Sequence, residues 1–207
     1  MRIQKKGVLA KLLERGIRIL LKKECNKIDK IKIDILASSF QIIKGIIQKI
    51  YIIGSGINYK DLLFDEIELE ANDIKIRYKR NNMEFNFINN FAVNFKIKLS
   101  ENSLKKVLLS NNWNWICDVI NDGLLHHYKL SDIKIKDDKI LIKTSEDNQI
   151  LNKEEKIDIK AENGNLFLEN KASNKSIKIP IEDKIYIKNV NIKKNLINIS
   201  ANSSISF

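Results

Sequence analysis

The chain of 207 residues has little of what breaks or staples a fold: one proline (Pro180), seven glycines and two cysteines. So little proline and glycine excludes a flexible linker, and the length suffices for one substantial core. We therefore expect a single domain over 1–207. Cys25 and Cys117 stand alone, without a Cys-x-x-Cys spacing, and this excludes a disulfide framework or a zinc site built on cysteine.

Long hydrophobic runs are also missing. No stretch of 18 consecutive apolar residues occurs, so we expect no helix that spans a bilayer. The segment 8–21 is interrupted by Lys11, Glu14, Arg15 and Arg18, so it lacks the apolar region of a secretory signal. We expect a cytoplasmic protein that can bind peripherally to the inner face of the membrane.

Catalytic motifs are equally scarce. The chain has no G-x-S-x-G and no Gly-Lys-Ser/Thr, and its only histidines are the neighbours His126 and His127. Adjacent residues of a regular element cannot both face one metal, so we interpret them as polar residues at a helix end. Glu66, Glu68 and Glu70 line one strand face and predict a solvated surface, with a cation site as the alternative. We expect no catalytic residues, no metal and no cofactor.

One glycine pair raises the question of a phosphate-binding loop. Gly54-Ser55-Gly56 follows an apolar run, as in a nucleotide-binding fold, but position 59 is tyrosine where a third glycine is required. The next residues, Ile67, Leu69 and Ala71, alternate with glutamates, which indicates a strand in place of the necessary helix. The pair therefore predicts a turn between two strands.

The basic charge is confined to one part of the chain. Residues 1–60 hold 14 Lys/Arg and 4 Asp/Glu, a net of +10, out of +11 for the whole protein. A lysine-rich genome composition would raise lysine everywhere and does not explain this asymmetry. The concentration indicates an anionic partner, either phospholipid headgroups or nucleic acid.

Two periodicities define the secondary structure. Apolar residues at steps of three and four predict a basic amphipathic helix over 3–25. Alternating apolar and polar residues predict strands over 31–35, 42–53, 63–71, 74–78 and 85–99, with Ala71-Asn72-Asp73 as a junction. Alternation resumes from 130 to the end of the chain.

A second helical region lies between the two sets of strands. Ser100 is suited to cap it, and Asn111-Asn112 predicts a break. Trp113 and Trp115 cannot both face inward on a regular helix. They are packing residues, or one of them lies exposed or lines a cavity, where an interfacial tryptophan favours membranes. The element order predicts an α+β fold with mainly antiparallel strands.

The order of these pieces resembles the LmeA-like phospholipid-binding family of bacteria, over about residues 8–127. The similarity rests on an amphipathic helix that ends near Cys25 and on short motifs downstream. These motifs are Ser39 to Gly45, Gly54 and Gly56, Tyr59-Lys60-Asp61-Leu62, and Leu99-Ser100-Glu101-Asn102-Ser103-Leu104. The C-terminal β-rich part, about 128–207, is similar only in character.

The resemblance implies a fold like the tubular lipid-binding proteins, in which a strongly curved antiparallel sheet cradles a long helix. It implies a non-enzymatic protein that binds phospholipid. It also gives the glycine pair a second role, since Gly54 and Gly56 would let a long strand bend around the helix.

We therefore expect a phospholipid-binding protein that acts at an anionic membrane surface and holds acyl chains between helix and sheet. The alternatives are a nucleic-acid-binding protein that uses the basic segment, and a structural interaction module. The expected apolar lining is Leu13, Ile17, Leu20, Trp113, Trp115 and Ile116. The expected contacts to the anionic surface are Lys5, Lys6, Lys11, Arg15, Arg18, Lys22 and Lys23.

Overall fold

The computed structural model describes residues 7–79, 84–125, 128–146 and 149–206. Four α-helices and one π-helical turn are present among them. They are α1 (Val8–Glu24), α2 (Ser39–Ile43), α3 (Glu101–Leu108), α4 (Trp115–Ile120) and η1 (Asn121–Leu125). The expected helix over 3–25 thus begins at Val8 within the described residues, because the backbone of Gly7 is extended. The expected cap of the second helical region is confirmed, since the Ser100 side chain accepts a hydrogen bond from the Ser103 amide.

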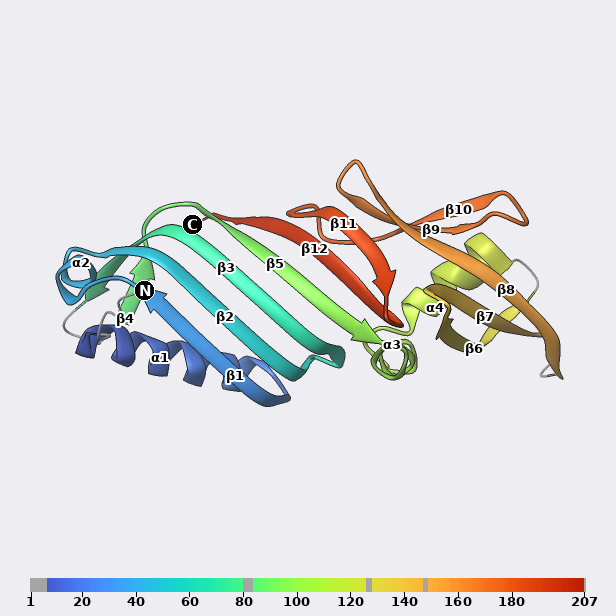
Figure 1. Cartoon of the computed structure of the whole chain (residues 1–207), viewed down its shortest axis with the longest axis horizontal. Coiled ribbons are helices and arrows are strands. Elements are labelled where there is room, and N and C mark those ends of the chain that lie inside the picture. The colour runs from blue at the N-terminus through green and yellow to red at the C-terminus, as the bar shows by residue number, and fades with distance from the viewer. Residues whose placement is uncertain (1–6, 80–83, 126–127, 147–148, 207) are drawn as a thin grey trace.

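The strands form two sheets that lie next to each other along the long axis of the molecule (Figure 1). The larger sheet has the order β1-β2-β3-β5-β12-β11, with β4 paired to β3, and the smaller has the order β10-β9-β8-β7-β6. Every pairing is antiparallel, which confirms an α+β fold dominated by antiparallel strands. The strands are β1 (Lys27–Leu36), β2 (Ile46–Tyr59), β3 (Leu62–Lys79), β4 (Glu84–Phe87), β5 (Phe91–Ser100), β6 (Lys129–Lys136), β7 (Lys139–Glu146), β8 (Gln149–Glu162), β9 (Asn165–Asn170), β10 (Lys175–Ile179), β11 (Ile185–Lys193) and β12 (Leu196–Ile205).

The larger sheet has one apolar and one charged face, as the period of two requires. Ile52, Leu69 and Phe95 are cross-strand neighbours on the apolar face. On the other face the carboxylates of β3 meet lysines of the adjacent strands. The pairs are Glu66 with Lys98, Glu68 with Lys96 and Glu70 with Lys49. The three glutamates therefore lie half-exposed in ion pairs on this face. Among the described residues, no group of three His, Cys, Asp or Glu side chains is arranged to hold a metal ion.

Two hydrophobic cores hold the protein together. The first lies under α1 and α2, where Leu13, Ile33, Ile42 and Ile74 are buried. The second is larger and joins the smaller sheet, α3, α4 and η1 to β11 and β12. The larger sheet contributes to both cores and so connects them.

The prediction of a turn at Gly54 and Gly56 is wrong, because β2 runs through both glycines to Tyr59. The chain reverses at Lys60 and Asp61, which have φ values of 49° and 67°. Gly56 has a φ of 58° inside the strand, so a residue with freedom at positive φ is needed there without a reversal of the chain.

The expected junction at 71–73 is also wrong. β3 continues through it as one strand of 18 residues, and the irregularity is absorbed by Asp73, with a φ of 54°. An aspartate tolerates the left-handed region better than most residues, so an Asn-Asp pair inside a strand need not end it.

Candidate functional site

Helix α1 shields an edge strand. Among the residues that the structure describes, strand β1 pairs only with β2, so one row of its backbone groups faces away from the sheet. The Ile35 amide donates to Oε1 of Glu14 at 3.3 Å, and Nη1 of Arg18 donates to the Ile31 carbonyl at 2.9 Å. Ala10 and Leu13, on the same side of the helix, are buried. The helix is therefore fixed along β1 by apolar packing and by two side chains that bond its edge.

The outer side of α1 combines apolar and basic residues that are exposed to solvent. Val8 is 80% exposed, and Leu12, Ile19 and Leu20 are also exposed. Between them lie four exposed basic residues, which are Lys11, Arg15, Lys22 and Lys23. An amphipathic helix normally buries its apolar positions, so a helix with exposed apolar residues on its outer side presents a second binding face.

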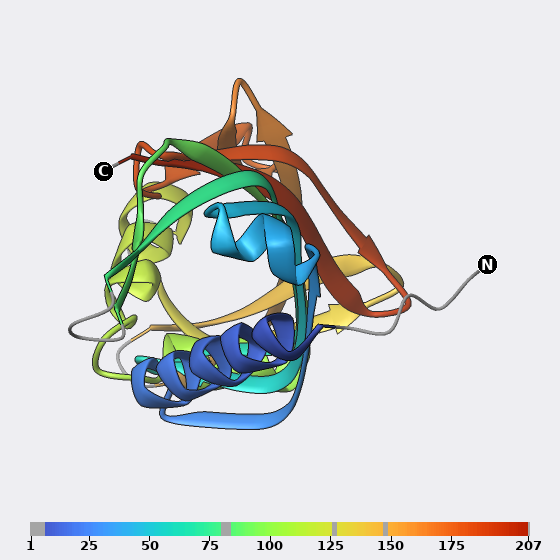
Figure 2. The same ribbon diagram turned by 90° about the vertical axis from the view of Figure 1, so that its left-hand side faces the viewer.

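The short helix α2 extends this surface. Its N-terminus is fixed by a capping box between Ser38 and Gln41, and its only buried apolar side chain is Ile42. Phe40 and Ile43 are 64% and 74% exposed, and Nζ of Lys44 lies 4.2 Å from the centre of the Phe40 ring. Figure 2 shows α1 and α2 together at one end of the molecule. We call these residues of α1 and α2 the terminal surface.

The terminal surface is defined by two sets of exposed residues. The apolar set is Val8, Leu12, Ile19, Leu20, Phe40 and Ile43. The basic set is Lys11, Arg15, Lys22, Lys23 and Lys44.

The expected apolar lining is not brought together. Leu13 is 8% exposed and belongs to the first core, and Ile17 packs beside it. Leu20 points to solvent on the terminal surface. Ile116 instead packs against the second core, so no single cavity contains the six expected residues.

The two tryptophans lie close to each other, away from α1. Both are half-buried, with ring centres 6.3 Å apart. Nε1 of Trp113 donates to the Lys60 carbonyl at 2.8 Å, and Asn112 bonds the carboxylate of Asp61 in the same loop. This hydrogen bond fixes Trp113 at the β2–β3 turn, and the ring of Trp115 lies next to it.

The expected basic contacts divide into three groups. Lys11, Arg15, Lys22 and Lys23 are exposed on the terminal surface, as expected. Arg18 is half-buried and bonded to β1, so it holds the helix. Lys5 and Lys6 lie outside the described residues, as do His126 and His127. The sequence missed Phe40 and Ile43, which lie just before and at the start of the expected strand segment 42–53 but belong to α2. The Ser-x-x-Gln spacing of Ser38 and Gln41 was the signal that predicts a helix start there.

The two cysteines and the lengths of the helices limit what the chain can do. Burial raises the pKa of both the Cys25 and the Cys117 thiol, with nearby carboxylates adding to the effect, so neither forms a thiolate readily. Within the described residues, every helix is too short or too polar to cross a membrane.

No family model, curated protein or solved structure matches this chain. The resemblance to the LmeA-like family therefore stays a prediction that rests on the amphipathic helix and the short motifs.

Proposed function

We propose that this protein is a non-enzymatic phospholipid-binding protein that docks on an anionic membrane through the terminal surface. The observation that carries the proposal is the exposure of Phe40 and Ile43 next to the apolar and basic outer side of α1. Apolar side chains between basic ones suit the boundary between headgroups and acyl chains. Nucleic acid would use the lysines but would leave most of the exposed apolar area without a partner.

The energies favour reversible binding. A lysine or arginine near an anionic bilayer contributes about 1 kcal/mol, so half of the five basic residues supply roughly 2–3 kcal/mol. Each large apolar side chain that becomes fully buried adds about 1.5–3 kcal/mol. Phe40 and Ile43 of α2 therefore supply at least as much binding free energy as the charges do. The two contributions together support peripheral binding.

The location of acyl chains is the finer part of the proposal. Leu13 and Ile17 fill the space between α1 and β1, so a chain held there would first have to displace the helix. On β3 and β5, Ile67, Leu69 and Ile97 are half-buried on the apolar face of the larger sheet and belong to neither core. We place the acyl chains on this apolar strip. The curved, tubular sheet that the resemblance implies would deepen this strip.

Vesicle co-sedimentation tests the docking surface. We expect binding to vesicles that contain anionic lipid, little binding to neutral vesicles, and strong weakening at about 0.5 M salt, where the Debye length falls to about 4–5 Å. The double variant Phe40→Ser/Ile43→Ser should weaken binding about tenfold or more, because two inserted side chains are lost. The control is Leu109→Ser, which removes an apolar side chain beyond α3 that is even more exposed.

A charge-matched pair of variants tests the electrostatic part. Changing Lys11, Arg15, Lys22 and Lys23 to Gln should remove the preference for anionic vesicles. The control changes four exposed lysines elsewhere, which are Lys156, Lys178, Lys184 and Lys193. Equal loss in both variants would show that only net charge matters and would contradict the assigned surface. Tight binding to duplex DNA without vesicle binding would replace the proposal by nucleic-acid binding.

A further inference from the structure

Exposed apolar side chains gather at one end of the long axis of the molecule. That end contains α2, β4, the start of α1 and the last residues of β1 and β3, whereas the smaller sheet forms the other end (Figure 1). Seven of the 13 large apolar side chains that are exposed among the described residues lie there. Besides Val8, Phe40 and Ile43 of the terminal surface, they are Leu36, Ile46, Phe87 and Ile88. By contrast, no large apolar side chain is exposed in the described part of β6 to β10.

This end is one continuous surface, because its elements touch one another. Gly7, at the start of α1, lies against the side chain of Ser39 in α2. The carbonyl of Gly45, just after α2, accepts a hydrogen bond from the Ile76 amide of β3 at 2.8 Å. Ile76 in turn pairs with Phe87 of β4. The terminal surface therefore continues from the two helices onto the ends of the strands.

On the strands this surface again combines apolar and basic residues. Ile46 of β2 is the cross-strand partner of Lys75, and the Ile88 amide donates to the Lys75 carbonyl at 2.9 Å. Ile46 and Ile88 are 42% and 49% exposed, and the lysine between them is exposed too. Two residues further along β3, Arg77 is also exposed. We call Ile46, Lys75, Arg77, Phe87 and Ile88 the strand-end surface.

The exposed apolar side chains of this end lie on both faces of the sheet. Because cross-strand partners share a face, Ile46 lies on the exposed face with Lys75, and Phe87 lies on the core face with the buried Ile76. An antiparallel sheet with one solvated face normally has its apolar residues on the other face. Apolar exposure on both faces at the same place indicates that the end of the sheet, and not one face of it, meets a partner.

The exposed charge of this end is positive. Its exposed basic residues are Lys11, Lys44, Lys75 and Arg77. Asp73 is the one exposed carboxylate among the described residues of this end, which leaves a net charge of +3 from four cations and one anion. Asp34 and Glu70 are half-buried, and each lies 3.0 Å from the Nζ of a lysine. The exposed charges therefore favour an anionic partner.

We infer that the whole of this end docks on the anionic bilayer, so that the strand-end surface is a second membrane contact and the long axis of the molecule stands upright on the membrane. A bilayer surrounds an inserted end from all sides, which suits apolar and basic side chains on α2 and on both faces of the sheet. The smaller sheet then points away from the bilayer. The inference rests on the proposed function, because it assumes that the terminal surface binds a membrane.

Co-sedimentation with vesicles of phosphatidylcholine and phosphatidylglycerol tests the apolar part of the second contact. Ile46→Ser/Ile88→Ser should weaken binding about fivefold or more, because two side chains lose their contact with the bilayer. The control is Leu109→Ser/Tyr186→Ser, which changes two exposed apolar residues away from this end and should leave binding unchanged.

A second pair of variants in the same assay tests the charges. Lys75→Gln/Arg77→Gln should weaken binding about tenfold, since two cations near the anionic surface are lost. Lys156→Gln/Lys178→Gln removes the same charge from exposed positions of the smaller sheet, far from the bilayer in the upright orientation. This control should bind nearly as tightly as wild type.

A solvent-sensitive fluorophore on a single introduced cysteine measures the orientation directly. The labelled variants are Ile43→Cys in α2, Ile88→Cys in the strand-end surface and Ser176→Cys in β10, each in a chain with Cys25→Ala and Cys117→Ala. On anionic vesicles that carry a lipid-bound quencher, the labels at 43 and 88 should be quenched to a similar extent. The label at 176 should stay unquenched, because β10 belongs to the opposite end.

The outcomes distinguish this inference from the proposed function. Quenching at 43 without quenching at 88, or with quenching at 176, would overturn the upright orientation and leave docking through α1 and α2. Wild-type binding by both Ile46→Ser/Ile88→Ser and Lys75→Gln/Arg77→Gln would also remove the second contact alone. Absence of any binding to anionic vesicles would remove the proposed function and the inference together.

Discussion

Two helices of this protein each place a carboxylate against the edge of a sheet, and they differ in the other contacts that hold them. On α1, Glu14 accepts the amide of Ile35 at the end strand β1. On α3, Glu101 accepts the amide of Ile135 at the end strand β6, at 2.9 Å. In each case a carboxylate pairs a backbone donor that would attract a strand of another molecule. The two helices thus protect their sheet edges by the same kind of hydrogen bond. They differ in how many other contacts stabilise each helix.

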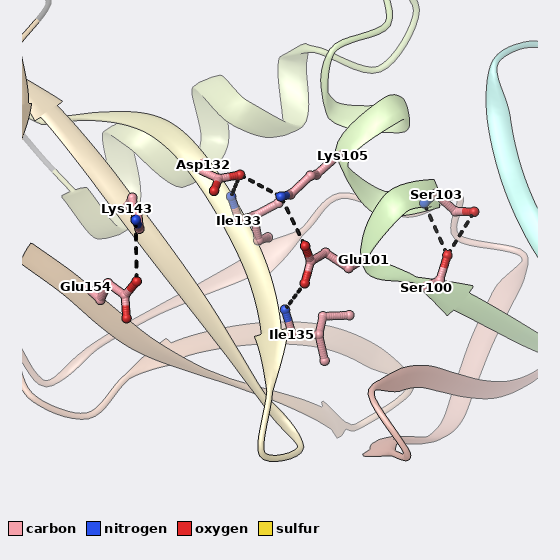
Figure 3. A network of polar contacts seen from close by, with 9 residues as sticks. All are labelled: Ser100, Glu101, Ser103, Lys105, Asp132, Ile133, Ile135, Lys143 and Glu154. Atoms are coloured by element: carbon pink, nitrogen blue, oxygen red, sulfur yellow. Dashed lines mark hydrogen bonds and ion pairs between the residues drawn. The ribbon is translucent and has the colours of Figure 1, made fainter.

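Helix α3 is fixed by a network of polar contacts (Figure 3). Nζ of Lys105 lies 3.1 Å from Oε1 of Glu101 and 2.9 Å from Oδ1 of Asp132 on β6. The hydrogen bond from the Ile135 amide, followed by that from Lys105, lowers the pKa of Glu101. The hydrogen bond from Lys105 lowers the pKa of Asp132, and its bond to Asp132 raises the pKa of Lys105. The three charges thus stabilise one another.

Helix α1 lacks the supports that α3 has at its N-terminus. Its N-cap is Gly7, which provides no side-chain hydrogen bond, and its first turn has no acidic residue. By contrast, α3 has both the Ser100 cap and Glu101 in its first turn. Helix α3 packs against β3, β5 and β6, whereas α1, the less supported helix, carries the exposed apolar surface. This difference agrees with a role in which α1 adapts to a membrane, because segments that meet a partner commonly have low local stability.

The largest effect is expected from a charge in the first core. Leu13→Asp should lower the free energy of unfolding by about 3–5 kcal/mol, because an unpaired carboxylate is buried against β1. Leu108→Asp on α3, at a site that is also buried, is the matched variant for the second core. Urea denaturation measures both. A Leu13→Asp protein that unfolds like wild type would show that α1 is peripheral to the fold.

The next largest effect distinguishes the edge contact of Glu101 from that of Glu14. Glu101→Ala should destabilise by about 1–3 kcal/mol, because it leaves the Ile135 amide unpaired and removes a partner of Lys105. Glu14→Ala should cost less, since its bond to Ile35 is longer, at 3.3 Å. Amide exchange at Ile35 and Ile135 reports each edge directly. Equal losses in the two variants would contradict the difference in firmness between α1 and α3.

A smaller effect is expected from pH. The folded pKa values of Glu101 and Asp132 lie below their unfolded values of about 4.3 and 3.9, so their contribution is complete above about pH 5 and is lost as pH falls through the folded values. The raised pKa of Lys105 has the opposite sign, and its contribution is lost only at strongly alkaline pH. Amide exchange at Ile133 and Ile135 between pH 5 and pH 3 measures the acid effect. In Lys105→Met this acid dependence should become shallower, and an unchanged slope would mean that Lys105 does not hold the two carboxylates.

The smallest effect is a stabilisation of α1. Gly16 lies in the exposed middle of the helix, and a Cβ atom built on it meets no atom within 4 Å. Gly16→Ala should therefore raise stability by about 0.5–1 kcal/mol through helix propensity alone. Thermal melting measures the gain, and amide exchange should slow mainly in 8–24. Slower exchange in α3 to the same extent would show that the two helices unfold as one unit.

Much of the fold could be predicted from local pattern. The alternation of Ile31, Ile33 and Ile35 identified β1, and Ser100 identified the start of α3, because each signal depends on near neighbours in the chain. The turns were predicted less well. Gly56 and Asp73 have positive φ inside long strands, and a glycine or an Asn-Asp pair has the same composition in a turn and in a strand irregularity. The bonds that neighbouring strands make to β2 and β3 decide between the two.

The sequence by itself determined the antiparallel α+β class, the basic first 60 residues, the amphipathic α1 and the absence of familiar catalytic motifs. Only the tertiary structure decided which side of α1 is covered. Periodicity shows that a helix has two sides but contains no information on what packs against each, so Leu13 and Leu20 are alike in sequence and opposite in burial. The structure also decided that Ile46 and Ile88, far apart in the chain, lie on either side of Lys75 at one end of the sheet. Contacts between residues so distant in sequence follow from how β2, β3 and β4 pair, which local propensity does not specify.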